Sequence, residues 1–369
     1  MRAIFRAASH RVSGRDGVMR IAGIGVAVPG QSVSNQDIVQ TIERERPRDT
    51  FSGAIARSIL SLLEAAGSEI RYYRAPGELA RDLTRTAMLG ALTQCGLSPR
   101  DIDLVIYCSV GRGFLEPGNA YFCANLLGMR CECFDIADAC MGWLRAANLA
   151  HDALAVRRHR RVMVVSAEFG VPQLVAQCCQ IDSPLELRRV FTAFTLGEVA
   201  TATVFEASDQ TWSFTYRSRP DLADLCTLPL PGHVGFTAYS PRLARAKPLR
   251  LDAHSAELFG AAEAEMHALL PETVGDLRAP DLYVPHSASS TWILASAYRA
   301  QIPREKVFAS IMPRFGNVVS ASLPLGLFYA AREGFLRPNA DVVLCPASAG
   351  LCVGIGRFCW DSESAHVAS

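Results

Sequence analysis

Cys140 lies where a predicted apolar strand gives way to a helix, in the segment Phe-Asp-Ile-Ala-Asp-Ala-Cys-Met-Gly-Trp of residues 134–143. At a helix N-terminus, the helix dipole and the free backbone N–H groups favour the thiolate, which is the nucleophilic form of cysteine. Gly142 allows another stretch of backbone to pass close by. The local pattern fits a nucleophilic cysteine, and it also fits a buried structural one.

Three other residues hold positions where side chains often take part in chemistry. His286 ends a predicted strand, 282–285, and precedes a helix, and open α/β sheets place their sites at such strand ends. Asn317 belongs to a Gly-Asn turn, where its amide either caps the turn or points an N–H group at an oxygen in a pocket. Glu116 lies in a loop, Ser-Val-Gly-Arg-Gly-Phe-Leu-Glu-Pro, where an exposed carboxylate is the plain interpretation.

These residues are connected by alternating strands and helices. The expected strands are 19–28, 103–110, 134–136, 161–166, 200–205, 282–285, 307–310, 341–346 and 351–358. The expected helices are 36–45, 52–66, 78–95, 120–127, 141–155, 256–270, 290–300 and 321–332. This alternation predicts mostly parallel sheets with helices on both faces. Because the pattern restarts after about residue 250, the element order also predicts an internal duplication.

The same pattern divides the chain into segments. Residues 1–18 are basic, lack an apolar core and are interpreted as a leader, so that Met1 and Met19 are both candidate starts. Residues 19–205 form the N-terminal half, which carries the cysteine. Residues 206–369 form the C-terminal half, with a proline-containing connection or cap at about 206–250.

Composition narrows the classes of function. The formal charge is +1, from 37 basic and 36 acidic residues, which favours neither nucleic acid nor an anionic membrane as a partner. No apolar run of about 18 residues is present, so no membrane span is expected. The 12 cysteines mostly lie in apolar runs without paired metal-ligand spacing, which indicates a reduced cytoplasmic protein without a bound metal.

Taken together, the motifs resemble the ketoacyl-acyl carrier protein (ACP) synthase III branch of the thiolase superfamily. The resemblance rests on Asp-Ile-Ala-Asp-Ala-Cys around Cys140, Val-Pro-His-Ser-Ala-Ser around His286 and Phe-Gly-Asn-Val-Val-Ser-Ala-Ser-Leu-Pro-Leu-Gly-Leu around Asn317. The segment Pro-Ala-Ser-Ala-Gly-Leu-Cys-Val-Gly follows at 346–354. The resemblance covers about 19–358 and implies a homodimer with the α/β thiolase fold, a duplicated five-layer αβαβα arrangement.

The resemblance also implies roles for the residues. Cys140 would accept the acyl group from coenzyme A (CoA) or an acyl carrier protein. His286 and Asn317 would donate hydrogen bonds to an enolate oxygen. The backbone N–H groups of Cys140 and Gly350 would form the oxyanion hole for the thioester carbonyl. No cofactor other than the thioester substrates is implied.

A narrower resemblance concerns the loop Ser109–Pro117. This loop is similar to that of the head-to-head condensing thiolases, which include the olefin-initiating acyl-CoA condensing enzymes and the pyrone- and resorcinol-forming ketosynthases. The segment 183–197 resembles the same group. In that group a glutamate on the loop crosses the dimer interface and acts as the base in the partner's site, and the matching residue here is Glu116.

The sequence departs from the common pattern at three places. Ser287 follows His286 where glutamine is usual, and Ser348-Ala349 replaces glycines. The N-terminal Trp-and-Arg signature for pantetheine docking is absent, and the region 50–74 carries Arg57, Arg71 and Arg74 instead. These departures bear on the carrier and the acyl chain rather than on the nucleophile.

We therefore expect an acyltransferase that performs a Claisen-type condensation of acyl thioesters, without decarboxylation, through acyl-Cys140. Three alternatives remain: a decarboxylative ketoacyl synthase that uses malonyl-ACP, acyl transfer to an alcohol or amine, and a non-catalytic subunit of a condensing heterodimer. The intact Cys140, His286 and Asn317 set argues against the last. The sequence does not define the acyl chains, the donor or the final product.

Overall fold

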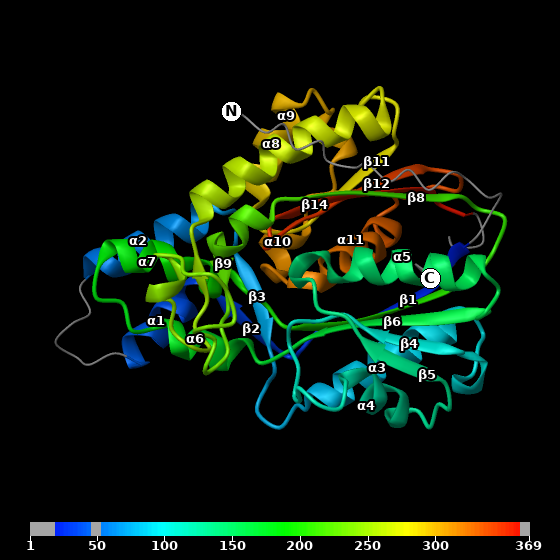
Figure 1. The fold of residues 1–369 in the computed structure, drawn as a ribbon, viewed down its shortest axis with the longest axis horizontal. Helices are drawn as coiled ribbons and strands as arrows, with labels where there is room; N and C mark the ends of the chain where they lie inside the picture. The colour runs from blue at the N-terminus through cyan, green and yellow to red at the C-terminus, as the bar shows by residue number, and fades with distance from the viewer. Residues whose placement is uncertain (1–18, 46–52, 362–369) are drawn as a thin grey trace.

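The computed structural model describes residues 19–45 and 53–361 and arranges them in five layers (Figure 1). Two mixed sheets are separated by a layer of helices, and further helices cover the outer face of each sheet. The predicted leader, 1–18, lies outside the described residues. Within the described residues, no helix is both long and apolar enough to cross a bilayer.

The first sheet has five strands in the order β1-β7-β6-β4-β5. They are β1 (Met19–Ala27), β7 (Val199–Ala207), β6 (Arg161–Glu168), β4 (Leu104–Tyr107) and β5 (Glu132–Asp135). Strand β4 is parallel to β5 and β6, whereas β7 is antiparallel to β6 and β1. The outer helices on this sheet are α3 (Ala80–Gln94) and α4 (Asn119–Leu126).

The second sheet repeats this arrangement. Its main strands are β11 (Leu282–Pro285), β12 (Asp341–Cys345), β14 (Cys352–Cys359) and β8 (Trp212–Ser218), paired in that order. The directions are the same as in the first sheet: β11 is parallel to β12, and β14 is antiparallel to β12 and β8. The parallel bridge between Tyr283 and Val307 takes the place that β5 holds in the first sheet. Strand topology thus confirms the predicted duplication.

The middle layer holds the two most enclosed helices, α5 (Gly142–Ala155) and α11 (Ser322–Arg332). Their apolar side chains join both sheets in one core cluster, in which Trp143, Leu144, Leu325 and Leu327 have no exposed surface. Both helices therefore begin in the interior of the molecule. Residues placed at their N-termini lie between the sheets, away from bulk water.

The remaining elements lie beside the sheets or cover the second one. Helices α8 (Ser255–Val274) and α9 (Ser290–Arg299) cover the outer face of the second sheet. The shorter helices are α1 (Asn35–Glu45), α2 (Gly53–Ala65), α6 (Val171–Cys178), α7 (Pro184–Val190) and α10 (Ile311–Phe315). The minor strands are β2 (Gln31–Ser34), β3 (Ile70–Tyr73), β9 (Cys226–Thr227), β10 (Asp252–Ala253) and β13 (Ala347–Ser348).

Two predictions of local structure were wrong. The expected irregular connection begins with β8, a full strand of the second sheet whose Trp212, Phe214 and Tyr216 alternate with polar residues. The strand expected at 307–310 is reduced to the single bridge at Val307. Helices α6 and α7 were not predicted either, because both are shorter than the windows in which helical periodicity becomes clear.

Candidate active site

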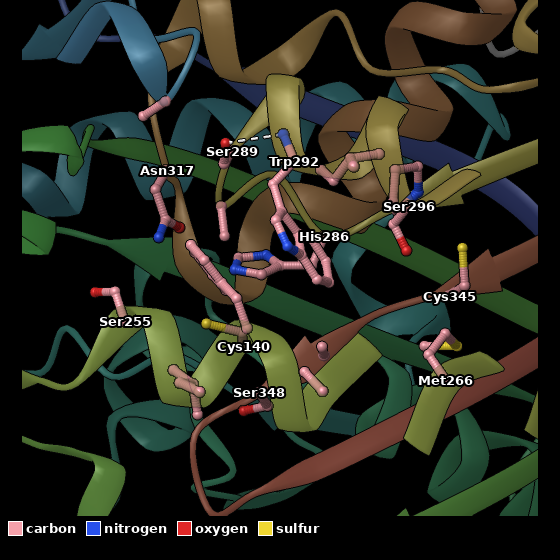
Figure 2. Close-up of a pocket in the computed structure, with 18 of the residues that line it drawn as sticks. Cys140, Ser255, Met266, His286, Ser289, Trp292, Ser296, Asn317, Cys345 and Ser348 are labelled. Carbon is pink, nitrogen blue, oxygen red and sulfur yellow. Dashed lines mark hydrogen bonds between the residues drawn. The ribbon is translucent and has the colours of Figure 1, made fainter. Parts of the chain in front are cut away.

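Cys140 is the middle residue of a 3₁₀ turn, Ala139–Met141, which leads directly into α5. The preceding Ala139 has a φ of 44°, a left-handed conformation that is uncommon for residues other than glycine. Gly142 is required at the start of α5, because a Cβ atom there would lie 2.3 Å from the carbonyl oxygen of Cys108. This backbone presents the Cys140 side chain to an internal cavity (Figure 2).

His286 directly follows β11 and lines the same cavity as Cys140. Its Nδ1 atom lies 3.0 Å from the hydroxyl oxygen of Ser322, the first residue of α11. Burial lowers the pKa of His286 to about 4, so the imidazole is neutral near pH 7. With Nδ1 held by Ser322, Nε2 is the ring nitrogen left to act on a ligand.

Asn317 is fixed by its backbone and by its side-chain oxygen. Its N–H donates to the carbonyl of Thr195 at 2.8 Å, and its carbonyl accepts from the N–H of Gly197 at 3.0 Å. The side-chain Oδ1 accepts from the N–H of Val319 at 2.9 Å, which fixes the amide orientation because a backbone N–H needs an oxygen partner. The amide nitrogen is therefore left to donate into the cavity that Asn317 lines.

The three side chains converge, as the motifs predicted. Figure 2 shows Cys140, His286 and Asn317 directed toward one end of the cavity from three separate segments of the chain. A thiol, a neutral imidazole and an amide donor thus surround one space. Such a set can form a thioester and stabilise an oxygen that gains negative charge.

The expected thiolate character of Cys140 is not found. Burial, together with the nearby Cys226 and Glu168, raises the pKa of Cys140 well above its usual value. The accessible surface of its side chain faces an internal cavity rather than bulk water, so desolvation outweighs the helix terminus. The raised pKa favours the thiol over the thiolate in the resting site.

The cavity has a volume of about 430 Å³ and a mostly apolar lining. From the end that holds Cys140 it extends between α8 and α9 and the second sheet, toward Met266, Ser296 and Cys345 (Figure 2). Apolar cavities of this size commonly hold most of a small molecule's surface. The shape is suited to an aliphatic chain whose reactive end lies at Cys140.

The other two predicted site residues, Gly350 and Glu116, are not among the residues that line the cavity. Gly350, with a φ of 126°, occupies the turn between β13 and β14, and its neighbours Ala349 and Leu351 line the cavity. The same turn contacts the segment before Cys140, because the hydroxyl of Ser348 donates to the carbonyl of Asp138 at 3.2 Å. Glu116 is exposed and does not line the cavity of its own subunit.

The loop that carries Glu116 is anchored at both ends. On one side, the buried carboxylate of Glu168 accepts from the N–H groups of Val110 and Gly111, at 3.3 and 3.0 Å. On the other side, the carboxylate of Asp135 accepts from the N–H groups of Asn119 and Ala120, both at 2.8 Å. The tip, Phe114–Pro117, is left exposed between two fixed ends.

Two of the three arginines noted for carrier docking have structural roles. Arg71 is fully buried and donates to Asn35 and Ser68 at 2.5 and 2.7 Å. Arg74 donates to the buried carboxylate of Glu198. Of the three, Arg57 alone is exposed. In the described ranges, 19–45 and 53–361, no group of three or more His, Cys, Asp or Glu side chains could hold a metal.

Sequence reasoning missed Ser322 and Glu168. Ser322 orients His286 although 36 residues separate them, and a serine in a helical segment carries no signal of such a partner. Glu168 ends a buried strand, where a charged residue is rare unless it has partners. Its partners, Ser320 and the loop at Val110, become apparent only when the two halves of the chain are assembled.

The comparisons with known proteins agree with this arrangement. Residues 276–360, which include both His286 and Asn317, match the family model for the C-terminal part of 3-oxoacyl-ACP synthase III. A beta-ketoacyl-ACP synthase III from Methylococcus capsulatus is 26% identical over 342 residues, which cover 91% of this chain and 97% of the relative. Its counterpart from Symbiobacterium thermophilum is 27% identical over 350 residues, 92% and 97% of the two chains.

Solved structures share the fold. A variant of OleA from Xanthomonas campestris superposes with a TM-score of 0.79 at 21% identity, covering 94% of this chain and all of that one. A cysteine-to-serine variant of the same protein, solved with lauric acid and lauroyl-CoA, has a TM-score of 0.77 at 22% identity, with 93% and 99% covered. The layers and strand order described above are those of the thiolase fold.

Proposed function

We propose that this chain, which has the thiolase fold and is similar to ketoacyl-ACP synthases III, joins two acyl thioesters in a Claisen-type condensation. The main support for the proposal is that Cys140, His286 and Asn317 all line one end of a long apolar cavity. The thiol supplies a covalent carrier, the two polar groups supply hydrogen bonds to a developing enolate, and the cavity accommodates the chain.

The first half-reaction moves an acyl group from CoA or an acyl carrier protein to Cys140. Since the resting thiol is protonated and His286 is neutral, Nε2 of His286 accepts the proton as the sulfur attacks the thioester carbon. The N–H groups of Cys140 and Gly350 receive the carbonyl oxygen. The carrier thiol leaves with the proton, which returns His286 to its neutral form.

The second half-reaction forms the carbon–carbon bond. A base removes an α-proton from the second thioester, and the enolate oxygen accepts hydrogen bonds from His286 and Asn317. The enolate carbon attacks the acyl carbon on Cys140, and the cysteine sulfur leaves. The product is a β-ketoacyl thioester, and this chemistry calls for no metal or redox cofactor.

The base in this proposal is Glu116 of the partner subunit. Strand β5 is an edge of the first sheet, and edges of this kind pair readily with a second chain. Exposed apolar side chains surround it: Phe114, Leu115, Tyr121, Phe122 and Phe134. A patch of this kind marks an association surface, and a homodimer formed here would bury it. The Glu116 loop belongs to the same surface and would reach across it.

Mass spectrometry tests the acyl carrier. After incubation with acyl-CoA or acyl-ACP, we expect one acyl mass per chain on the peptide that contains Cys140, and none in Cys140→Ala. Cys133→Ala is a matched control, since it removes a cysteine outside the cavity. Equal labelling of Cys131 or Cys133 in Cys140→Ala would refute the assignment.

Hybrid dimers test the base. General-base catalysis contributes about 10²–10⁴ in rate, so Glu116→Gln should acylate Cys140 normally but condense non-malonyl thioesters slower by about that factor. Mixing Glu116→Gln with Cys140→Ala forms hybrids in which one site has its own cysteine and the glutamate of the partner subunit. We expect part of the activity to return. Normal condensation by Glu116→Gln would exclude the role.

A decarboxylative ketoacyl synthase that uses a malonyl thioester is the second candidate. One observation favours it: the relatives of 26% and 27% identity carry the name beta-ketoacyl-ACP synthase III. In that reaction the loss of CO₂ forms the enolate, and no base is needed. A strict requirement for malonyl thioesters would select this candidate.

A further inference from the structure

His267 and Ser296 form a hydrogen-bonded pair in the wall of the acyl cavity, away from the catalytic residues. His267 lies on α8 and Ser296 on α9, and both line the cavity. Nearer Cys140 the same two helices are joined by the stacked rings of Phe259 and Trp292, whose centroids are 5.2 Å apart. Along α8, His267 lies eight residues beyond Phe259, a rise of about 12 Å.

On the side that faces the cavity, the surroundings of this pair are mostly apolar. Met266, Leu270, Ile302 and Val307 also line the cavity, and all four are buried. Figure 2 shows Ser296 and Met266 at the end of the cavity that lies away from Asn317. A hydroxyl group beside a plain hydrocarbon chain would be desolvated without gaining a partner, which is unfavourable.

The tautomer of His267 decides whether the hydroxyl proton of Ser296 can point into the cavity. Nε2 of His267 lies 3.2 Å from the carbonyl oxygen of Ser296 and 3.0 Å from its hydroxyl oxygen. In the tautomer that carries the proton on Nε2, this N–H donates to both oxygens of Ser296. Among the described residues, the hydroxyl proton of Ser296 then has no acceptor.

The second layer of this cluster holds the histidine in place. Glu263, one turn before His267 on α8, lies 3.6 Å from Nε2 and is paired with Arg299 of α9 at 2.5 Å. The carboxylate oxygens are acceptors, which suits the tautomer with the proton on Nε2. The carboxylate also repels a second negative charge nearby. The wall therefore offers a hydroxyl donor to a neutral oxygen rather than to a carboxylate.

We propose that His267 and Ser296 form a specificity subsite for an acyl chain that carries a neutral oxygen, a hydroxyl or keto group, in its distal part. Ser296 donates the hydrogen bond, and His267 is a positioning residue that orients the hydroxyl toward the cavity. The inference rests on the proposed acyl-Cys140 intermediate and names the class of chain that this intermediate carries. The reaction at Cys140 itself is unchanged.

The test uses acyl-CoA thioesters of one chain length that differ only in the carbon carrying a hydroxyl group, with the unsubstituted thioester as reference. The rate of Cys140 acylation at limiting thioester is followed by intact-protein mass spectrometry. For hydroxyls at one or two adjacent distal carbons, we expect acylation about 2- to 10-fold faster than the reference, the effect of one net hydrogen bond.

Three variants assign the effect to the subsite. Ser296→Ala should abolish the advantage while still accepting the unsubstituted chain, and Ser296→Thr, which keeps a hydroxyl, should retain it. Ser255→Ala is the matched control, because Ser255 lines the end of the cavity nearer Cys140 and its loss should leave the advantage intact.

Two failures can be told apart. If no thioester acylates Cys140, the proposed function is wrong, and this inference with it. If Cys140 is acylated but no hydroxylated chain exceeds the reference, or if Ser296→Ala keeps the advantage, the inference alone is overturned.

Discussion

The turn that begins α5 and the turn that begins α11 are counterparts in the two halves of the chain. Each is a three-residue 3₁₀ turn whose first residue has a positive φ, 44° at Ala139 and 48° at Val319. The residue that follows is Cys140 in one half and Ser320 in the other. The backbone that presents the Cys140 side chain therefore occurs twice in the chain.

The surroundings of the two turns differ. Cys140 faces the cavity beneath α8 and α9, whereas Ser320 has no exposed surface and donates to the buried carboxylate of Glu168 at 2.5 Å. Glu168 also accepts from the N–H of Gly111, so the buried carboxylate links Ser320 to a loop of the N-terminal half. The turn alone does not make a nucleophile, because the segments packed over it determine whether a substrate can reach it.

Residues near the two turns also occupy equivalent positions in the two halves. Cys108 follows β4 directly as His286 follows β11, and Gly142 begins α5 as Ser322 begins α11. Asn317 precedes Val319 by two residues, where the N-terminal half has Ala137. One half thus supplies the thiol, and the other supplies the imidazole and the amide, on two copies of one framework.

Moving the thiol from one turn to the other is the strongest test of this comparison. In Cys140→Ala combined with Ser320→Cys, the thiol occupies the counterpart position but remains buried beside Glu168. We expect no acyl adduct with any thioester, measured by intact mass, while wild-type protein is labelled on Cys140. Labelling of the new cysteine would show that the turn, not its surroundings, determines reactivity.

Removing the two groups of the C-terminal half gives the next largest effect. His286→Ala and Asn317→Ala should each lower condensation by about 10²–10³, the usual effect of losing one oxyanion donor. The two should differ in the first half-reaction, which is measured separately by the rate of Cys140 acylation. His286→Ala slows acylation because it also removes the acceptor of the thiol proton, whereas Asn317→Ala acylates normally. Near wild-type condensation by either variant would refute its role.

The sequence was sufficient to predict the features that depend on local residue patterns. Cys140, His286 and Asn317 each lie where a strand or turn meets a helix, and their neighbours carry recognisable motifs. The duplication followed from element order, and the strand pairing confirmed it. Strand β8 was not predicted, although Trp212, Phe214 and Tyr216 alternate with polar residues in the sequence. This alternation lay within a segment that was interpreted as irregular.

Features that depend on distant segments could not be predicted. The helix terminus at Cys140 favours a thiolate, but burial raises its pKa, and so do Cys226 and Glu168, which lie far along the chain. The pairing of His267 with Ser296 joins two helices across 29 residues. Sequence motifs identify reactive side chains, but not the dielectric environment that sets their protonation.

The buried imidazole of His286, in the C-terminal half, predicts a pH dependence of stability. The pKa of His286 is lowered to about 4, so the unfolded chain binds a proton at higher pH than the folded chain does. The contribution to stability is present above the ordinary histidine pKa of about 6.5 and is lost as pH falls toward 4.

The matching measurement is urea unfolding at two pH values. Between about pH 7.5 and about pH 5, His286 should reduce the free energy of unfolding by about 2 kcal/mol. His286→Gln should remove that part of the acid destabilisation. Asn317→Ala alters the same cavity without removing a titrating group and should keep the wild-type dependence. Equal pH dependence in wild type and His286→Gln would contradict a lowered pKa.

The smallest expected effect concerns Ser322, the counterpart of Gly142. In the N-terminal half a side chain at this position would collide with the carbonyl of Cys108, but in the C-terminal half the Ser322 hydroxyl reaches Nδ1 of His286 at 3.0 Å. A hydroxyl both donates and accepts, so it can support His286 with Nε2 protonated for the enolate and with Nε2 free for the thiol proton.

Ser322→Ala should therefore lower kcat for condensation about 2- to 10-fold, the worth of one hydrogen bond, and leave KM nearly unchanged. Alanine is well tolerated in a helix, so a loss of fold is not expected. Ser322→Thr keeps the hydroxyl and should restore most of the rate, which separates orientation of His286 from packing. If Ser322→Ala condensed at the wild-type rate, or raised KM alone, the hydroxyl would have no part in orienting the imidazole, and the two helix starts would differ only in the space around them.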